Sequence, residues 1–514
     1  MAAPVDYSTY LVTDSTPGIL GDRDLCQVVE AALQGGVTIV QYRDKHSSRD
    51  VVVETAKKLH DICKRFQVPF LINDQVDVAA EIGCEGKARE LLGPNKIIGV
   101  TASSVEEALQ AAKAGADYLG IGTVFSTQTK KDTKSIIGPN GVRTILSQLA
   151  ASGHGGISTV CIGGINISNT QQVMTQSSAP AKSLNGVAVV SAIIAAANPA
   201  AAARELSSKV LTAKVPDVIR AVAKKTPLSH NMTNLVGVPI SQVVQNFAAN
   251  VGLAVGASPI MANYAEEAAD LAKLGGSLVI NMGTVTPDGL KNYVQALEAY
   301  NAAGGPVLLD PVGYVPTFIP NLYNGPHANT IPNSAGATAV RRSAVKTLLA
   351  AGSFAVIKGN EGEIQTLHGA SVTQRGVDSD STLSLAQRAS VVQSVARAHS
   401  AVVLMTGVTD ILSDGRRTFR VDNGHELLAQ VTGTGCTLGT TISAMIAAYP
   451  QDTLLAAVAG TAMFGVAAEL AAGRAEVRGP GTFVPAFIDE LYSVRKATAE
   501  NDSRWLSLVK ISHI

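Results

Sequence analysis

The chain has 514 residues, which is too long for a single hydrophobic core and predicts two or three domains. Its 41 lysines and arginines balance 41 aspartates and glutamates, so the sequence offers no surplus of charge for a nucleic acid or an acidic membrane. Small-molecule chemistry is therefore the favoured class of function.

The compartment is indicated by the cysteines and the apolar runs. Five scattered cysteines without a C-x-x-C pair argue against a disulfide framework and a zinc site, and they suit a reducing compartment. The stretch MAAPVDYSTYLVTDS has no basic segment followed by an apolar one, so no secretory signal is predicted. The apolar runs 186–197 and 454–468 are too short and too rich in alanine and glycine to span a bilayer. We therefore expect a cytoplasmic protein with no membrane partner.

The first half alternates short β-branched runs with helical patterns, which is typical of βα units around a parallel sheet. The predicted strands are Tyr10–Asp14, Thr38–Arg43, Pro69–Asp74, Lys96–Thr101, Asp117–Gly122, Thr159–Ile165 and Gly186–Ile193. The predicted helices include Leu25–Leu33, Val51–Phe66, Val105–Ala114 and Gly141–Leu149. A (β/α)8 barrel is the natural closure of such a series, but a barrel needs one strand more than this series supplies.

Polar residues collect at the carboxyl ends of these strands, where a barrel places its active site. Gln41, Arg43 and Lys45 follow one another at period-2 spacing, so their side chains face the same way and suit a diphosphate. Asn73 and Asp74 end the next strand, and the carboxylate suits a hard cation such as Mg²⁺.

Three more such motifs follow along the chain. Residues 127–132 add hydroxyls and cations, and Gly163-Gly164-Ile165 and Val190-Ser191-Ala192 lie at strand ends where barrels commonly hold a phosphate on backbone amides. Each motif alone also fits a solvated loop, an N-cap or a plain turn. Together, all at strand ends, they favour one site.

The segments LVTDS, VQYRDK, LINDQVDVA, GTVFSTQTKKD, IGGI and VAVVSAI together resemble thiamine phosphate synthase, over about residues 6–208. The resemblance implies a TIM barrel that joins hydroxymethylpyrimidine diphosphate to a thiazole phosphate and releases pyrophosphate. It implies that the pyrimidine diphosphate is held by Gln41, Arg43, Lys45, Asn73 and Lys130, with Thr101 near the leaving group. It also implies Mg²⁺ at Asp74, and the thiazole phosphate at Thr127, Thr129, Gly164, Val190 and Ser191.

The sequence departs from that family after Gly86. A stretch is absent that in the family carries a further strand and a second magnesium-binding aspartate, so the missing strand and the missing ligand are the same gap. We expect the synthase half to be impaired or inactive, because one carboxylate holds Mg²⁺ poorly against competing phosphates.

An alanine-rich helical stretch closes the first half, and Val215-Pro216-Asp217 has the character of an entry to a new domain, so we place the domains at residues 1–212 and 213–514. The second half again alternates strands and helices and predicts a mostly parallel α/β sheet. Its predicted strands are Ser277–Asn281, Val307–Asp310, Ala355–Lys358, Val402–Thr406 and Asp410–Ser413.

The second half is organised around Val431-Thr432-Gly433-Thr434-Gly435-Cys436, which precedes a helical run at 437–448. Glycines in a turn at the start of a helix leave backbone N–H groups free for an anion. A thiol beside such amides can have its pKa lowered toward neutrality, enough to act as a base. The alternative is that Cys436 is a small buried residue and the glycines form a plain turn.

Other strand ends of this half supply partners for that turn. Asp310 and Glu363 suit Mg²⁺, Lys358 and Thr406 suit a nucleotide, and the glycine turn suits the transferred phosphoryl group. Neither a Walker A motif nor the glycine loop of protein kinases is present. The pattern therefore favours phosphoryl transfer to an alcohol.

The segments SHNMTN, VVQNFAANVGLAVGASPIM, LLDPVG, IKGNEGEI, VVLMTGVTDILSDG, VTGTGC and GPGTF closely resemble hydroxyethylthiazole kinase, over about residues 216–500. The resemblance implies a ribokinase-like domain with the thiazole alcohol at Met261 and Gly433, ATP at Lys358 and Thr406, and Cys436 in place of an aspartate base. It implies a kinase trimer with sites between subunits, so a homo-oligomer is expected. An insert from Tyr314 to about Ser334 departs from the family and predicts a long surface loop.

The leading interpretation is a bifunctional enzyme of thiamine biosynthesis, similar to the fungal arrangement, in which the kinase half makes the thiazole phosphate that the barrel consumes. Two alternatives remain open at this point. One is a kinase for another small alcohol, and the other is a barrel that binds phosphates without catalysis.

Overall fold

The computed structural model describes residues 5–82, 97–127, 129, 135–233, 240–262, 264–283, 286–312, 339–369 and 383–514. Contacts divide the chain into two compact units, residues 1–214 with His513, and residues 215–512 with Ile514. Lys130 and the insert at 314–334 lie outside the described residues.

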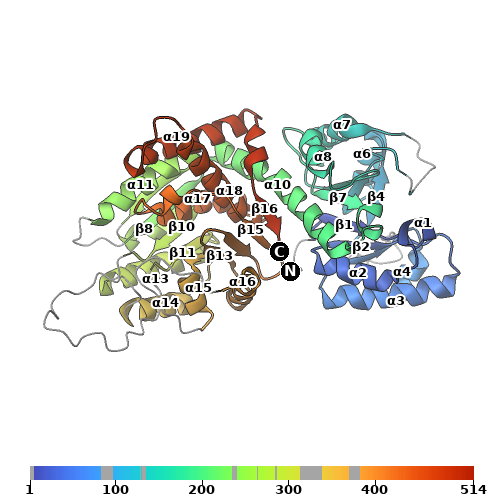
Figure 1. The fold of residues 1–514 in the computed structure, drawn as a ribbon, viewed down its shortest axis with the longest axis horizontal. Helices are drawn as coiled ribbons and strands as arrows, with labels where there is room; N and C mark the ends of the chain where they lie inside the picture. The colour runs from blue at the N-terminus through green and yellow to red at the C-terminus, as the bar shows by residue number, and fades with distance from the viewer. Residues whose placement is uncertain are drawn as a thin grey trace. The chain divides into compact units, whose positions relative to one another are not determined.

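The first unit is built on a seven-stranded sheet in the order β3-β2-β1-β7-β6-β5-β4, in which every neighbouring pair is parallel. The strands are β1 (Thr9–Val12), β2 (Ile39–Tyr42), β3 (Phe70–Ile72), β4 (Gly99–Ala102), β5 (Tyr118–Ile121), β6 (Ser158–Ile162) and β7 (Gly186–Val189). The helices are α1 (Pro17–Leu20), α2 (Leu25–Gln34), α3 (Arg49–Arg65), α4 (Val76–Ile82), α6 (Val105–Lys113), α7 (Gly138–Ala151), α8 (Thr170–Ser177), α9 (Ser191–Ile194) and α10 (Pro199–Lys225), the last crossing the unit boundary. Helices α2, α3, α6, α7 and α8 surround the strands (Figure 1).

The prediction of a parallel, barrel-like sheet is confirmed. Within the described residues β3 and β4 each have one neighbour, so the sheet is open between them, at the place where the sequence predicts a missing strand. The predicted strands are all longer than the observed ones, and the last two overrun most clearly. Residues 191–194 form α9 instead of continuing β7, and β6 ends at Ile162 because Gly163 and Gly164 take positive φ values of 99° and 67°.

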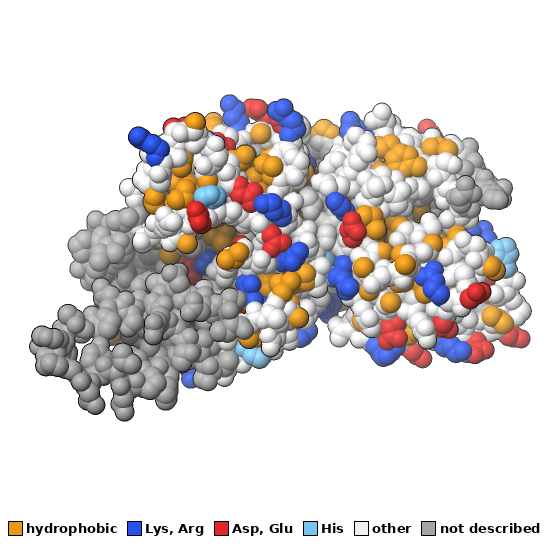
Figure 2. Space-filling view, in the orientation of Figure 1, with side chains coloured by type: hydrophobic (Ala, Val, Ile, Leu, Met, Phe, Trp, Pro, Cys, Tyr) orange, Lys and Arg blue, Asp and Glu red, His pale blue; other side chains and the backbone are white. Residues whose placement is uncertain are grey.

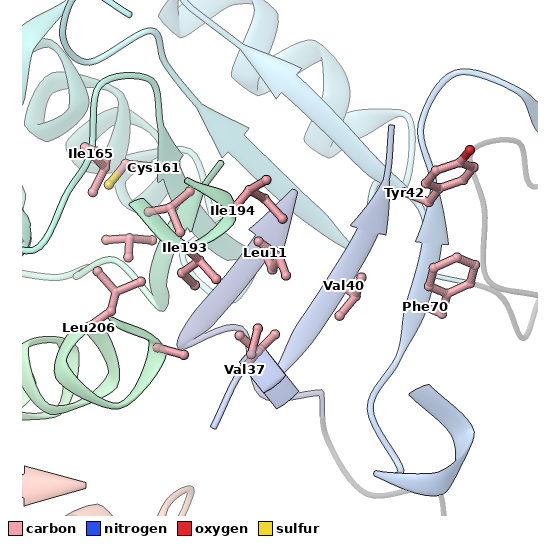
Figure 3. Packing of buried hydrophobic residues seen from close by; sticks show 14 of the residues in the cluster. Leu11, Val37, Val40, Tyr42, Phe70, Cys161, Ile165, Ile193, Ile194 and Leu206 are labelled. Carbon is pink, nitrogen blue, oxygen red and sulfur yellow. The ribbon is translucent and has the colours of Figure 1, made fainter. Parts of the chain in front are cut away.

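Side chains on the two faces of this sheet form separate cores, as the period-2 alternation of a strand requires. On β1, Leu11 packs outward against the helices, whereas Tyr10 and Val12 point into the barrel. Figure 3 shows the outer face, where Leu11, Val40 and Phe70 project from three adjacent strands.

The second unit is built on a nine-stranded sheet in the order β16-β15-β14-β13-β12-β11-β10-β8-β9. The strands are β8 (Leu228–Thr233), β9 (Ser258–Ala262), β10 (Ser277–Asn281), β11 (Val307–Asp310), β12 (Val356–Asn360), β13 (Val402–Thr406), β14 (Asp410–Ser413), β15 (Thr418–Val421) and β16 (Ile511–His513). The helices are α11 (Ile240–Val255), α12 (Ala268–Lys273), α13 (Pro287–Ala302), α14 (Ala339–Ala351), α15 (Glu361–Leu367), α16 (Leu385–His399), α17 (Thr434–Ala448), α18 (Thr453–Ala472) and α19 (Pro480–Ala499). Short 3₁₀ turns lie at Ala265–Glu267, Glu426–Leu428 and Arg504–Leu508.

Helices cover both faces of this sheet, with α11, α17, α18 and α19 on one side and α13, α14, α15 and α16 on the other (Figure 1). One helix of the described residues, α18, is long and apolar enough to cross a membrane, but 89% of its apolar window is buried within the protein. It therefore serves as a core helix. On the face drawn in Figure 2, basic and acidic side chains are interspersed, in keeping with the balanced composition.

The five strands predicted for this half are confirmed, but β8, β9, β15 and β16 are not among the predictions. Strand β8 reads LSHNMT and is polar because its side chains bond to α17. Ser229 Oγ lies 3.2 Å from Ser443 Oγ, and Thr440 Oγ1 donates to Asn231 Oδ1 at 3.1 Å. A strand that buries hydroxyls and amides lacks the apolar alternation by which strands are found.

His230 lies between Ser229 and Asn231 on β8, and its side chain faces the opposite side of the sheet. It is fully buried beside the Tyr300 ring of α13, with 5.7 Å between the ring centroids. Neither ring nitrogen has a hydrogen-bond partner within the described part of the chain, and burial lowers the pKa of His230 to about 4. The folded state therefore binds its proton more weakly than the unfolded chain does, and stability must fall as pH drops from about 6.5 to about 4.

We predict that the His230→Leu variant loses part of this acid sensitivity. Between pH 7.5 and pH 4.5 the second unit of the wild type should lose roughly 2–3 kcal/mol more than that of the variant. Urea unfolding followed by the fluorescence of Trp505, the single tryptophan of the chain, measures the difference. His368→Gln, at the exposed end of α15, is the matched control and should keep the wild-type pH dependence. Equal pH slopes for wild type and His230→Leu would contradict the prediction.

Candidate active sites

A pocket of about 310 Å³ opens at the carboxyl ends of β2, β3 and β4 in the first unit. Among the residues that line it are six that the sequence predicts for one substrate and its metal, namely Gln41, Arg43, Lys45, Asn73, Asp74 and Thr101. The parallel strands therefore bring together residues that are up to 60 positions apart in the chain.

Arg43 is held in this pocket by a residue that the sequence reasoning did not select. Its Nη1 lies 3.3 Å from Oδ2 of Asp14, whose side chain is only 4% exposed, and its backbone N–H donates to Thr13 Oγ1. Asp14 also accepts hydrogen bonds from the N–H and hydroxyl of Thr16. The signal was present in the LVTDS motif, which places an aspartate two residues after the end of β1.

The floor of the pocket is formed by tyrosines inside the barrel. Tyr10 of β1 and Tyr118 of β5 line the pocket, and their hydroxyl oxygens lie 2.6 Å apart. Desolvation raises the pKa of Tyr118 to about 12, so the pair stays protonated and neutral at physiological pH. The inner end of the pocket is therefore uncharged, and the charged groups gather at its mouth.

Asp74 lies at that mouth, exposed, with φ at 61°. Its Oδ2 accepts a hydrogen bond of 2.8 Å from the Asn73 amide. Among the described residues lining the pocket Asp74 is the one carboxylate. Its hard oxygen donors suit Mg²⁺, which protein sites commonly hold with one or two carboxylates and the phosphates of a substrate.

The residues predicted to hold the thiazole phosphate do not line this pocket. Thr127 and Thr129 follow β5, Gly164 follows β6, and Val190 and Ser191 follow β7. Gly164 is required there, because a Cβ atom would lie 2.7 Å from Phe125 Cβ and from Ser126 O. Phe125 and Ser126, which precede Thr127, thus pack directly against Gly164. The structure does not join these residues to the pocket.

In the second unit, polar side chains lie at or near the carboxyl ends of four adjacent strands. They are Asn281 on β10, Asp310 on β11, Lys358 on β12 and Thr406 on β13. Lys358 Nζ lies 3.1 Å from Asp310 Oδ1, and the Asn281 amide donates to Asp310 Oδ2 at 3.1 Å. Lys358 and Asp310 are 5% and 2% exposed, so the ion pair is buried.

Burial and charge act against each other in this pair. Desolvation raises the pKa of Asp310, and Lys358 only partly offsets it. Desolvation alone would lower the pKa of Lys358, but the facing carboxylates of Asp310 and Glu363 outweigh it and raise the pKa. In both groups the partner thus opposes the effect of burial on the charged form.

The glycine turn lies beside this pair. Gly433 caps α17 with φ at 92°, a conformation that favours glycine, and the helix begins at Thr434. Helix α17 thus starts three residues earlier than predicted, and Cys436 lies in its first turn. A Cβ atom on Gly435 would be 3.9 Å from Lys358 Nζ, so the first turn of α17 approaches the buried lysine.

The predicted lowering of the Cys436 pKa is wrong. Although the residue keeps partial solvent exposure, desolvation and then the Asp310 carboxylate raise the pKa of the thiol to about 12. Lys358 and a hydrogen bond with Asn281 act in the opposite direction but are weaker. The positive end of the helix is therefore outweighed, and the thiol is protonated at neutral pH.

Glu363 and Thr406 are fixed by backbone contacts. Glu363 Oε2 accepts the Asn360 N–H at 2.8 Å in a capping box at the start of α15, and Thr406 donates to Gly359 O at 3.3 Å. Glu363 thus lies one turn of helix beyond the end of the strand that carries Lys358. The described residues hold no cluster of three metal-ligating side chains, so a cation here would need phosphate oxygens as further ligands.

Met261 and Gly433 are not joined by the contacts of the described residues. Met261 lies near the end of β9, opposite Asn231 of β8, and a Cβ on Gly433 would meet Val244 of α11 at 3.3 Å. Asn281 was missed by the sequence reasoning, although it ends a correctly predicted strand.

Comparison with known proteins agrees with the division into two units. The thiamine monophosphate synthase family matches residues 9–193, and the hydroxyethylthiazole kinase family matches residues 219–319 and 330–497. The unmatched residues 320–329 fall inside the insert that the sequence predicts.

Relatives match the whole chain or one half of it. The chain is 37% identical over 549 residues to the probable thiamine biosynthetic bifunctional enzyme of Schizosaccharomyces pombe, with 99% of each chain covered. It is 34% identical over 552 residues to the thiamine biosynthetic bifunctional enzyme of Saccharomyces cerevisiae, covering 95% of this chain and 96% of the yeast chain. It is 38% identical over 295 residues to the hydroxyethylthiazole kinase of Roseiflexus sp., covering 57% of this chain and 96% of that kinase.

The Asp14–Arg43 pair allows binding and stability to be separated. We predict that Arg43→Gln weakens binding of Mg·pyrophosphate roughly 10- to 100-fold, since a hydrogen bond to a charged group is lost. It should also destabilise the barrel by about 1–3 kcal/mol, because the buried Asp14 loses its partner. Calorimetry and thermal unfolding followed by tyrosine circular dichroism measure the two effects.

Adding Asp14→Asn to Arg43→Gln should recover stability but not binding. Arg49→Gln, at the start of α3, removes an exposed partner of Asp77 on α4; it is the matched control and should change neither. A double variant as unstable as Arg43→Gln alone would show that the ion pair does not account for the stability loss.

Proposed function

The chain belongs to the family of bifunctional thiamine biosynthetic enzymes, and we propose which of its residues carry out the two reactions. The C-terminal half is a hydroxyethylthiazole kinase and the N-terminal half is a thiamine phosphate synthase. The kinase product, a thiazole phosphate, is a substrate of the synthase, so the halves catalyse consecutive steps. The boundary at residues 212 and 213 falls within α10.

The observation that carries the kinase assignment is the buried cluster of Asp310, Lys358 and Asn281 beside the first turn of α17. In the proposal, Lys358 and Thr406 contact ATP, and the free N–H groups of the glycine turn receive the transferred phosphoryl group. Met261 and Gly433 hold the thiazole alcohol. Asp310 and Glu363 supply the carboxylate oxygens that would hold Mg²⁺ together with the phosphates.

When bound there, Mg²⁺ neutralises charge on the phosphate oxygens. The chain's own residues orient the reactants. The capping box fixes Glu363, and the bonds from Lys358 and Asn281 fix both oxygens of Asp310. A site with carboxylates held in place before the ligand arrives spends little free energy on reorganisation.

Cys436 is the proposed proton acceptor beside the hydroxyl of the thiazole alcohol, and it acts in its thiolate form. Because burial and Asp310 raise the pKa of the thiol to about 12, only a small fraction is ionised at neutral pH. The rate of the wild-type kinase should therefore depend on pH in a range where a carboxylate base would not.

We predict that kcat of the wild-type kinase rises with pH between 7 and 9, because thiolate forms as pH approaches the thiol pKa. Cys436→Asp should keep substantial activity and show a flat profile over the same range. Cys436→Ala should lower kcat roughly 100-fold or more while changing KM little. Phosphorylation of hydroxyethylthiazole by Mg·ATP is the assay, and a full-rate alanine variant would return Cys436 to a packing role.

The synthase assignment is supported by the pocket that gathers Gln41, Arg43 and Lys45 at one strand edge. In the proposal these three, with Asn73 and Lys130, bind the pyrimidine diphosphate, and Thr101 lies near its leaving group. Asp74 supplies the oxygen ligand for Mg²⁺. Thr127, Thr129, Gly164, Val190 and Ser191 hold the thiazole phosphate.

We predict that the synthase step is the slower one and needs more Mg²⁺, because the pocket has one carboxylate among its described residues. Half-maximal synthase activity should need roughly tenfold more Mg²⁺ than half-maximal kinase activity, equivalent to about 1.4 kcal/mol of lost ligation. The kinase half of the same chain is the internal control. Equal Mg²⁺ requirements and a synthase rate matching the kinase rate would contradict the prediction.

The remaining parts of the proposal concern assembly and location. The substrates are small molecules, and we propose a cytoplasmic homo-oligomer built on a kinase trimer. A failure to phosphorylate hydroxyethylthiazole with retained turnover of another small alcohol would reject the kinase assignment. Binding of both synthase substrates without product would reduce the barrel to a phosphate-binding module.

A further inference from the structure

Arg388 of α16 lies behind the proposed nucleotide site and contacts two of its elements at once. The residue is 8% exposed. Its Nε lies 3.4 Å from Oε2 of Glu361, and its Nη2 donates a hydrogen bond of 2.7 Å to Thr409 O. One guanidinium therefore links the start of α15 to the turn between β13 and β14.

Glu361 is the first residue of α15 and is itself buried. It directly follows Asn360, which caps the helix, and Glu363 lies one position beyond Gly362 in the same turn. The Glu361 Oε1 atom accepts a hydrogen bond of 3.0 Å from Gln365, which fixes the carboxylate along the helix. The anchor of Arg388 is thus rigidly joined to the segment that carries Lys358 and Glu363.

The turn on the other side carries Thr406 and has little freedom around Arg388. A Cβ atom on Gly407 would lie 3.0 Å from Arg388 Nη2, so the guanidinium packs against the turn backbone. The Gly407 N–H donates to Asp410 Oδ1 at 3.0 Å, which closes the turn on itself. Movement of Arg388 would therefore move the backbone next to Thr406.

We propose that Arg388 and Glu361 are positioning residues that set the distance between Thr406 and the Lys358–Glu363 segment, and that they thereby determine the affinity for ATP. The inference rests on the proposed kinase function, in which Thr406 and Lys358 contact the nucleotide. The contacts of Arg388 described above go to the turn and to α15, and none of them goes to Met261 or Gly433, the residues proposed for the alcohol. Substitution of Arg388 should therefore weaken binding of the nucleotide and leave binding of the alcohol unchanged.

The planar guanidinium is what allows two elements to be held together. Nη2 donates a hydrogen bond to Thr409 O, whereas the contact of Nε with Glu361 is an ion pair without a hydrogen bond. The wide guanidinium can lie at both places at once, whereas lysine has a single ammonium on a flexible stem. Arg388→Lys keeps the charge but cannot hold Glu361 and Thr409 O in the same geometry. Glu361→Gln keeps the shape and removes the charge, so it loosens the same link from the other end.

The experiment measures KM for ATP and for hydroxyethylthiazole in wild type, Arg388→Lys and Glu361→Gln. KM for ATP should rise roughly 5- to 30-fold in both variants, while KM for the thiazole stays within about twofold. The double variant should be no more than about twofold worse than either single one, because both changes break one link. KM does not depend on the fraction of folded enzyme, so the ratio of the two KM values separates positioning from a general loss of stability.

Arg397→Lys is the matched control. Arg397 lies on the same helix, and its Nη1 donates to Gly415 O at 3.0 Å, a carbonyl of the turn between β14 and β15, away from the nucleotide. It should leave both KM values within about twofold of wild type. A similar rise in KM for ATP in this control, or equal rises for both substrates in Arg388→Lys, would overturn the inference.

Two further outcomes keep the inference apart from the function on which it rests. A wild-type chain that does not phosphorylate the thiazole counts against the proposed function. In that case the Kd of Mg·ATP is measured for wild type and Arg388→Lys. A Kd that is roughly 5- to 30-fold higher in the variant supports the positioning role, and an unchanged Kd rejects it. If Arg388→Lys yields no folded protein, Glu361→Gln decides on the same ratio, and an unchanged KM for ATP in that variant rejects the inference.

Discussion

Parallel strands that lie side by side end at the same edge of their sheet, and this constraint determines where charged residues meet in both units. In the second unit, Asn281 and Asp310 end β10 and β11 and Lys358 lies two residues before the end of β12, so no long loop is needed to join them. In the first unit the same geometry collects Arg43 and Asn73 at one mouth. The sites are therefore consequences of strand order, and the helices contribute mainly the walls and the helix start of α17.

The two sites differ in how their charges are held before a ligand arrives. The Lys358–Asp310 pair is buried, so an anion that approaches Lys358 meets a charge already compensated by Asp310. Phosphate binding at Lys358 would leave the buried Asp310 without its cationic partner, which is costly unless a cation arrives with the phosphate. This coupling favours entry of nucleotide and metal as one complex. Asp74 in the barrel is exposed, so its carboxylate carries no comparable desolvation cost.

The sequence was sufficient wherever periodicity and chemistry agreed. Leu11, Tyr10 and Val12 alternate as a strand should, and the charged residues after β2 and β3 line one pocket as predicted. It was insufficient where tertiary contacts replace local signals. Strand β8 is polar because α17 bonds to it, and the pKa of Cys436 depends on Asp310, which is far away in the chain. Asp14 likewise gains its role only through Arg43.

The open edge of the first sheet poses a physical problem, since among the described residues β3 and β4 each lack a hydrogen-bonded neighbour on one side. Strands β1 and β5 are separated by β7 and β6, so in a flat sheet they would be about 14 Å apart. Yet the hydroxyls of Tyr10 and Tyr118 meet at 2.6 Å across the interior. Because these two side chains meet, the sheet must curl. Their burial together with Tyr7 stabilises the curved form. The interior packing thus holds the seven strands in a barrel-like arc and keeps β3 and β4 facing one pocket, without a strand between them among the described residues.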